Sequence, residues 1–131
     1  MSNEQNDTEQ LALCRYYLEM LGQIIHADNE KWWTDMETGE RLQRNEAEMI
    51  ALQHSELSEA LEAVRKGLMD DKLPHRPGVE VELADCIIRI LDHGYGMGYD
   101  VAGALVEKIK YNRVREDHKI ENRKKDGGKK F

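Results

Sequence analysis

The chain has 131 residues and a formal net charge of −7, with 40% hydrophobic residues, 34% charged residues and two cysteines. This length allows one core but not two, and the composition favours a folded helical protein over a disordered one. Cys14 and Cys86 are isolated, which argues against a zinc site or a disulfide framework. No apolar run approaches the roughly 20 residues that cross a membrane, and no signal peptide is evident. We expect one cytoplasmic domain over residues 1–131 without a membrane partner.

The charge is unevenly distributed along the chain. Residues 106–131 contain ten Lys or Arg and five Asp or Glu, a net of +5, so residues 1–105 carry −12. A basic excess confined to one end argues against a general surface for nucleic acid polymers. An acidic body with a basic end instead suits a protein that holds a metal with acids and phosphate with bases.

The first helix is expected after a polar, irregular start over residues 1–7. Asp7 or Thr8 can cap it, and it should end near Asp28. Its apolar residues recur at three- and four-residue intervals: Leu11, Cys14, Leu18, Leu21 and Ile25. This spacing predicts an amphipathic helix. We expect His26, near its end, to be a surface partner of the helix dipole rather than a ligand.

Residues 29–44 lose this periodicity and predict a loop with a turn at Gly39. Trp32 and Trp33 lie together in this loop among polar residues. They either plug the end of a helix bundle or present a flat aromatic surface on which a nucleobase stacks. The two interpretations are compatible, because one tryptophan could serve each purpose.

A second helix is expected to begin near Asn45, which has the spacing of a capping box with Glu48. One stripe of this helix is apolar and comprises Ile50, Leu57, Leu61, Val64 and Leu68, with Met49, Leu52, Ala60 and Ala63 extending it to one side. Glu56 falls within this apolar arc and Glu59 lies at its edge. Because acids are seldom placed among apolar neighbours without a purpose, we interpret this pair as functional.

The third helix, expected from about Val79 to His93, is the most apolar in the chain and is predicted to be the most buried. Its polar strip contains Glu82, Asp85 and Arg89. The strip is either a salt-bridged stripe, with Asp85 paired to Arg89, or a second carboxylate pair in the same phase as the first. We expect the glycines of residues 94–98 to end this helix.

A fourth helix is expected to begin at Asp100, which can cap it. Lys108, Asn112 and Arg115 share one of its faces at positions i, i+4 and i+7. Such a stripe suits an anion with several oxygens.

The chain ends in a basic tail, residues 119–131. Chain ends are commonly loose, so this tail is either disordered or closes over bound phosphate. In the second case the backbone N–H groups of Gly127 and Gly128 would contact the phosphate.

Two carboxylate pairs opposed across a four-helix arrangement would form the oxygen-rich site that Mg²⁺ or Mn²⁺ prefers. Mg²⁺ usually shares its coordination with substrate phosphates, and metal-assisted attack of water on a phosphoanhydride is the chemistry that follows. The sequence has no Walker-type glycine loop. The acid pairs also lack the Glu-x-x-His pattern of a di-iron carboxylate bundle.

The motif Glu56-x-x-Glu59 followed by Glu82-x-x-Asp85 resembles the signature of the all-α nucleoside triphosphate pyrophosphohydrolases, specifically the short MazG-like proteins of bacteria and phages. Lys108-x-x-x-Asn112-x-x-Arg115 is similar to a further part of that pattern, and the resemblance covers about residues 45–116. The Lys31-Trp32-Trp33 loop and the Gly127-Gly128-Lys129 ending also resemble the small phage-type members.

The resemblance implies an all-α bundle of four to five helices that assembles as a homodimer or homotetramer. It implies hydrolysis of a nucleoside triphosphate, (d)NTP, between its α- and β-phosphates to (d)NMP and pyrophosphate, in nucleotide-pool control. Mg²⁺, replaceable by Mn²⁺, would be held by four catalytic acids, Glu56, Glu59, Glu82 and Asp85. Lys108, Asn112 and Arg115 would lie near the phosphates or sugar. Many members have a further acid where this chain has Ser55, which leaves the number of metal ions open.

The alternative is a non-catalytic helical module that binds or senses a nucleotide. In that interpretation the acids form salt bridges with Arg89 and with the basic tail, and the nucleotide is not hydrolysed. Divalent-ion binding distinguishes the two hypotheses.

Overall fold

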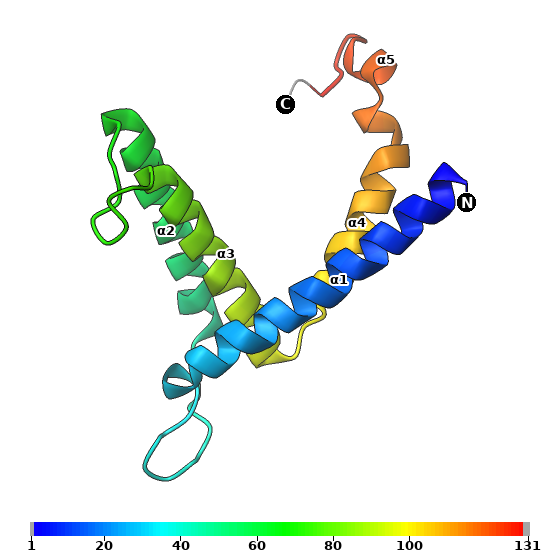
Figure 1. Cartoon of the computed structure of the whole chain (residues 1–131). Coiled ribbons are helices and arrows are strands. Elements are labelled where there is room, and N and C mark those ends of the chain that lie inside the picture. The colour runs from blue at the N-terminus through cyan, green and yellow to red at the C-terminus, as the bar shows by residue number, and fades with distance from the viewer. Residues whose placement is uncertain (1, 130–131) are drawn as a thin grey trace. The chain divides into compact units, whose positions relative to one another are not determined.

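The computed structural model describes residues 2–129, and over this range it is helical without a β-strand (Figure 1). The long helices are α1 (Asn3–Asp28), α2 (Glu46–Lys66), α3 (Gly78–Met97) and α4 (Val101–Val114). Shorter helical segments are η1 (Glu30–Trp32), η2 (Glu116–His118) and α5 (Ile120–Arg123). The all-α prediction is therefore confirmed. Met1 of the predicted irregular start and residues 130–131 of the predicted tail lie outside the described residues.

The chain divides into two compact units, and α1 contributes to both. The first unit comprises Met1–Glu19 and Asp100–Phe131, and the second comprises Met20–Tyr99. Both predicted carboxylate pairs and both tryptophans belong to the second unit. The expectation of a single domain stays a prediction.

The start of α1 differs from the prediction, because Asn3–Asp7 are helical. The reason is local: the Gln5 N–H donates to Ser2 Oγ and the Ser2 N–H donates to Gln5 Oε1, both at 3.3 Å. This reciprocal pair is a capping box that starts the helix earlier than Asp7 would.

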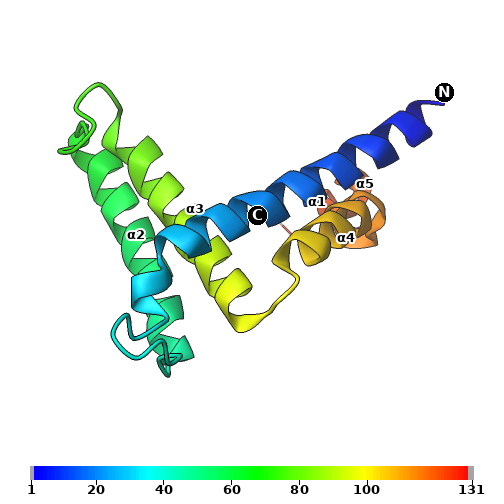
Figure 2. The same ribbon diagram turned by 60° about the horizontal axis from the view of Figure 1, so that its bottom comes forward.

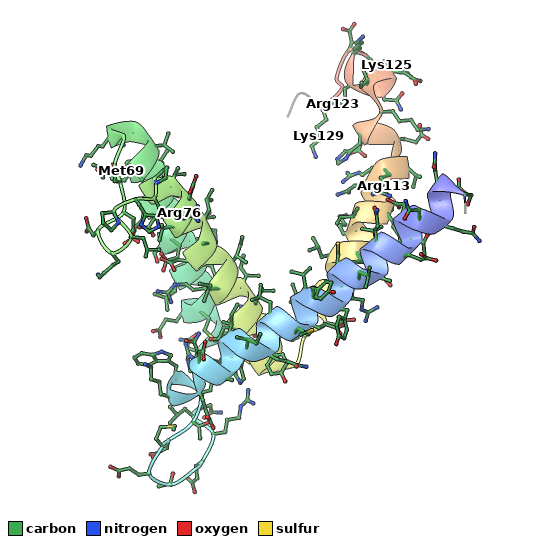
Figure 3. All side chains as sticks on the ribbon, viewed as in Figure 1. Met69, Arg76, Arg113, Arg123, Lys125 and Lys129 are labelled. Carbon is green, nitrogen blue, oxygen red and sulfur yellow. The ribbon has the colours of Figure 1, made fainter. Side chains whose placement is uncertain are left out.

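Two ion pairs join α1 to the α4 region within the first unit. Arg113, labelled on α4 in Figure 3, pairs with Asp7 at 2.6 Å. Arg15 pairs at 2.9 Å with Asp100. The Asp100 side chain also accepts a hydrogen bond from the Gly103 N–H at 2.8 Å, so the predicted cap of α4 is confirmed.

Helices α2 and α3 form an antiparallel hairpin in the second unit (Figures 1 and 2). Asn45 caps α2 by accepting a hydrogen bond from the Glu48 N–H at 3.3 Å, as its position in the sequence predicts. The residues buried on the two helices are mostly small or flexible: Met49, Ala60, Ala63, Cys86 and Leu91. A Cβ at Gly78 would lie 3.1 Å from the Ala63 Cβ, so small residues allow the two backbones to approach closely at this end.

The larger apolar side chains of the hairpin are exposed, contrary to the predicted core. On α2 and just after it these are Ile50, Leu57, Leu61, Val64 and Leu68, and on α3 they are Leu83, Ile87, Ile88 and Ile90. Helix α3 nevertheless contains more buried residues than any other helix in the described chain, as predicted, although this part of its surface is exposed. The two helices pack through the smaller residues beside the stripe, which leaves the stripe itself without cover inside the described chain.

Helix α3 extends beyond the predicted end near His93 to Met97, and the prediction that the glycines of residues 94–98 end it is confirmed at Gly98. Gly96 is buried against the ring of Trp33, where a Cβ would lie only 2.4 Å from the Trp33 Cη2 atom. The glycine thus serves close packing within the helix. Gly98, with φ +75°, provides the actual C-terminal cap. Within residues 2–129, none of the helices combines the length and apolarity that a membrane crossing needs.

Candidate functional site

Three of the four predicted acids meet across the α2–α3 hairpin. One carboxylate oxygen from each of Glu56, Glu59 and Glu82 lies within 4.8 Å of the other two. Glu56 and Glu59 are one helical turn apart on α2, and the antiparallel arrangement brings Glu82 of α3 opposite them. Glu56 is 7% exposed, whereas Glu59 is exposed and Glu82 is half-buried. The acid cluster of Glu56, Glu59 and Glu82 therefore extends from the helix interface to solvent.

The acids of this cluster disfavour one another's charge. The pKa of Glu82 is raised to about 7. Burial is the largest cause, the hydrogen bond with Glu59 and the charge of Glu59 follow, and Glu56 has a smaller effect. Three neighbouring carboxylates cannot all ionise cheaply, so the cluster holds a proton near neutral pH unless a cation replaces it.

Asp85, the fourth predicted acid, lies outside this group of three oxygens but close enough to sense it. Burial and the charge of Glu56 raise the pKa of Asp85, whereas the charge of Arg89 lowers it. The structure therefore places Asp85 at the margin of the acid cluster.

Arg89 pairs with Glu56 and not with Asp85, the partner that its i,i+4 spacing suggested. The Arg89 Nε atom lies 2.5 Å from Glu56 Oε1. Glu56 is the most buried acid of the cluster, so its need for a counter-charge is the greatest. The alternative in which Asp85 pairs with Arg89 is therefore wrong, because tertiary packing outweighs a weak i,i+4 interaction.

The donors of the acid cluster suit a hard divalent cation. All three residues that meet offer carboxylate oxygens, and neither His nor Cys belongs to the group. Mg²⁺ and Mn²⁺ favour such oxygen donors, and Mg²⁺ commonly takes only a few protein carboxylates and completes its coordination with water and phosphate. The raised pKa of Glu82 also indicates that the negative charge of the cluster is not fully neutralised by nearby cations. The residues present thus fit the predicted metal.

A cavity of about 600 Å³ adjoins the acid cluster in the second unit. It is lined by acids, two arginines, an aromatic ring and apolar side chains: Asn29, Trp32, Arg44, Leu52, Glu56, Asp85, Ile88, Arg89 and Asp92. Its volume is in the range of small-molecule sites. We call it the acid-side cavity.

The two tryptophans have different environments. Trp32 is 58% exposed and lines the acid-side cavity, so its ring is available for stacking. Trp33 is 2% exposed, and its Nε1–H donates to Asp92 Oδ2 at 2.9 Å. Trp33 is therefore a structural residue, and its prediction as a base-stacking candidate is wrong.

His26 also has a structural partner, which corrects its prediction as a surface residue. Its Nδ1 atom lies 2.9 Å from Asp92 Oδ1, and its ring packs against the rings of Trp33 and Tyr95. Asp92 is buried and joins His26 of α1 to the loop through Trp33. Only tertiary contacts across 59 and 66 residues create this network, so no local pattern indicated it.

Several residues around the acid cluster were missed in the sequence. Asn29 and Arg44 line the acid-side cavity. Asp70, in the connection after α2, lines a smaller cavity of about 210 Å³ together with Glu59 and Glu82, and its charge contributes to raising the pKa of Asp85. The Asp70-Asp71 pair so close to the prolines was the one available signal for a further acid near the site.

The predicted anion stripe lies in the first unit and is only partly helical. Helix α4 ends at Val114, so Arg115 has extended backbone and forms two hydrogen bonds to Asp117, at 2.6 and 2.5 Å. The Lys108 Nζ atom lies 4.7 Å from the centroid of the Tyr111 ring. Asn112 Oδ1 is buried without a hydrogen-bond partner in the described chain. The prediction of a continuous helical Lys-Asn-Arg face is therefore wrong at Arg115. That these three residues act at the same site as the acids stays a prediction.

The tail is folded as far as the structure describes it, through Lys129. The Asn122 side chain donates to the Glu116 carbonyl at 2.7 Å, and Gly127 makes a turn with φ +77°. The Gly128 N–H donates to the Lys125 carbonyl at 2.9 Å. That N–H group is thus used within the tail, which corrects its proposed availability for phosphate.

The second unit therefore combines a carboxylate cluster, the two arginines Arg44 and Arg89, and the exposed ring of Trp32 around one cavity. These groups offer the contacts that a metal ion, a polyphosphate and a base need. Comparisons with protein-family models, curated proteins and solved structures found no match for the chain.

Proposed function

We propose that the chain is a Mg²⁺-dependent nucleoside triphosphate pyrophosphohydrolase of the MazG-like type, for which Mn²⁺ can replace Mg²⁺. It hydrolyses (d)NTP between the α- and β-phosphates to (d)NMP and pyrophosphate, in cytoplasmic nucleotide-pool control. The observation that carries the proposal is the meeting of Glu56, Glu59 and Glu82 beside a cavity with an exposed tryptophan.

In the proposed reaction the acid cluster, with Asp85 at its margin, holds the metal. Bound Mg²⁺ supplies charge neutralisation at the phosphates and lowers the pKa of an attacking water. Arg44 and Arg89 line the cavity and offer planar donors to phosphate oxygens. Trp32 offers its ring to the base, and base stacking tolerates several bases because each has a π-face. Lys108, Asn112 and Arg115 are proposed to assist at the phosphates or sugar.

The proposed enzyme is a homodimer or homotetramer. The exposed apolar stripe of α2, with Leu61 60% exposed at its centre, supports this assembly. A contiguous stripe of large apolar side chains is a common mark of a protein–protein interface. A second copy would cover this stripe and the apolar residues of α3 that the hairpin leaves exposed.

The test compares Glu59→Gln with Glu62→Gln, a matched control three residues along α2. Glu62 pairs with Lys66 and is outside the acid cluster. Glu59→Gln should lower the rate of pyrophosphate release with Mg²⁺ and NTP by about 100-fold or more, because a metal ligand is lost. Glu62→Gln should retain activity, and circular dichroism should show both variants folded. Equal activity in the two variants would contradict the assignment.

A non-catalytic nucleotide-binding module remains the second candidate, and one observation favours it. Arg89 already neutralises Glu56, as that hypothesis requires. Calorimetry separates the candidates: the enzyme should bind Mg²⁺, at least in the presence of nucleotide. Nucleotide binding that is indifferent to Mg²⁺ would favour the module.

A further inference from the structure

The Arg89 guanidinium pairs with Glu56 within the acid cluster. Glu56 is the buried member of the cluster, and a buried carboxylate is strongly destabilising when it has no counter-charge. Within residues 2–129, Arg89 is the one cationic side chain that pairs with a member of the cluster. The guanidinium therefore supplies the charge that a divalent cation would otherwise provide.

Arg89 also has N–H groups that form no hydrogen bond within the described chain. It bonds Glu56 through Nε alone, and its terminal nitrogens make no hydrogen bond to another group in the described chain. Its side chain is 41% exposed and lines the acid-side cavity together with Trp32. A planar guanidinium with free terminal nitrogens beside a cavity is suited to bind phosphate oxygens in a bidentate manner.

We infer that Arg89 is an exchangeable counter-ion that passes from Glu56 to the polyphosphate when a divalent cation binds the acids. This inference rests on the proposed function and deepens it. The cation takes over the neutralisation of Glu56, and the released guanidinium neutralises the nucleotide. The contact of Arg89 with phosphate, proposed above, thereby depends on the bound cation, and the sequence did not indicate this coupling.

Exchange of the counter-ion makes cation and nucleotide binding cooperative. A cation that binds alone must displace Arg89 into solvent, whereas a nucleotide that binds alone must leave Glu56 buried without a partner. When both ligands bind, each takes one member of the ion pair. The increase in affinity must then be the same in either order of addition, because binding free energies are reciprocal.

The experiment measures binding to the full chain by calorimetry, with MgCl₂ and an α,β-methylene nucleoside triphosphate as probes. The variant is Arg89→Gln, and the matched control is Arg76→Gln. Arg76, labelled in Figure 3, belongs to the connection before α3; it pairs with Glu80 at 3.2 Å and is not a member of the cluster. Both substitutions remove one positive charge, so the control accounts for any general change in Mg²⁺ attraction.

Arg89→Gln should bind Mg²⁺ alone about threefold more tightly than Arg76→Gln, because the competing cation is gone. With Mg²⁺ present, it should bind the analogue about tenfold more weakly, because a charge-assisted bidentate contact is lost. Arg89→Lys retains the counter-charge and should remain folded even if the glutamine variant does not. It should bind Mg²⁺ like the wild type but bind the analogue more weakly, because an ammonium lacks the planar fork.

A structural counter-ion would give a different result. Analogue binding that is unchanged in Arg89→Gln, or in Arg89→Lys should the first variant not fold, would overturn the exchange while leaving the proposed function intact. Wild-type protein that binds no Mg²⁺, with or without the analogue, would instead contradict the proposed function itself.

Discussion

The raised pKa of Glu82 leads to a prediction that opposes the usual effect of mutation: Glu82→Gln should stabilise the metal-free protein at pH 8. The folded-state pKa of about 7 exceeds the ordinary value of 4.5. The folded protein therefore binds this proton more tightly than the unfolded chain does. Stability from the bound proton is present below about pH 4.5 and is lost as the pH rises to about 7. Glutamine has no such proton to lose.

The magnitude follows from the difference between the two pKa values. At about 1.4 kcal/mol for each pKa unit, the ionised Glu82 lowers the free energy of unfolding by at most about 3–4 kcal/mol. Glu82 is only half-buried, so solvent screening reduces this to about 1–2 kcal/mol. For a chain of this size that raises the melting temperature by about 3–8 °C at pH 8.

The assay is thermal unfolding at a fixed protein concentration, at pH 5 and pH 8, with EDTA and with Mg²⁺. Glu82→Gln should exceed the wild type in melting temperature at pH 8 in EDTA, and by much less at pH 5, where the folded wild type still holds the proton. It should also lose most of the stabilisation that Mg²⁺ gives the wild type, since binding to the folded state alone raises its stability.

The matched control for this prediction is Glu80→Gln, two residues earlier on α3. Glu80 is exposed and pairs with Arg76, so its loss should change stability by less than about 0.5 kcal/mol at either pH. A Glu82→Gln variant that is less stable than the wild type at pH 8 in EDTA would refute the electrostatic reasoning.

Three further predictions concern the loop, the helix end and the exposed stripe. Trp32→Ala should weaken nucleotide binding by about 1–3 kcal/mol in calorimetry, whereas Trp33→Ala should instead lower the free energy of unfolding by about 3–5 kcal/mol in denaturant titrations. Gly96→Ala should cost about 1–3 kcal/mol of stability in the same titrations, because the new Cβ would overlap the Trp33 ring; an unchanged midpoint would contradict this packing. Leu61→Glu should reduce the assembly to a monomer in light scattering, and a monomeric wild type would refute the proposed interface.

The parts of the fold that the sequence predicted depend on local interactions. Asn45 and Asp100 cap their helices by bonds to residues three positions away, and Gly39 makes its turn with φ +73°. The shared phase of the two acid pairs likewise follows from helical spacing. Glu56 and Glu82 meet because α2 and α3 pack as an antiparallel hairpin, through the small residues beside the predicted apolar stripe.

The parts that the sequence missed depend on contacts between distant residues. Gly96 could not be recognised as helical without knowing that Trp33 packs on it. The partner of Arg89 depends on which acid the packing buries, and i,i+4 spacing gives no information about that. The choice of buried face on α2 was likewise undetermined, because both the Leu61 side and the Ala60 side are apolar.

The most direct test of the proposed function is the identity of the products. Purified protein should be incubated with Mg²⁺ and a series of ribo- and deoxyribonucleoside triphosphates, and the reaction followed by ³¹P NMR. We expect equal amounts of nucleoside monophosphate and pyrophosphate, with no reaction in EDTA. Orthophosphate and a nucleoside diphosphate would contradict cleavage between the α- and β-phosphates, and a complete lack of turnover with bound nucleotide would contradict the enzyme assignment.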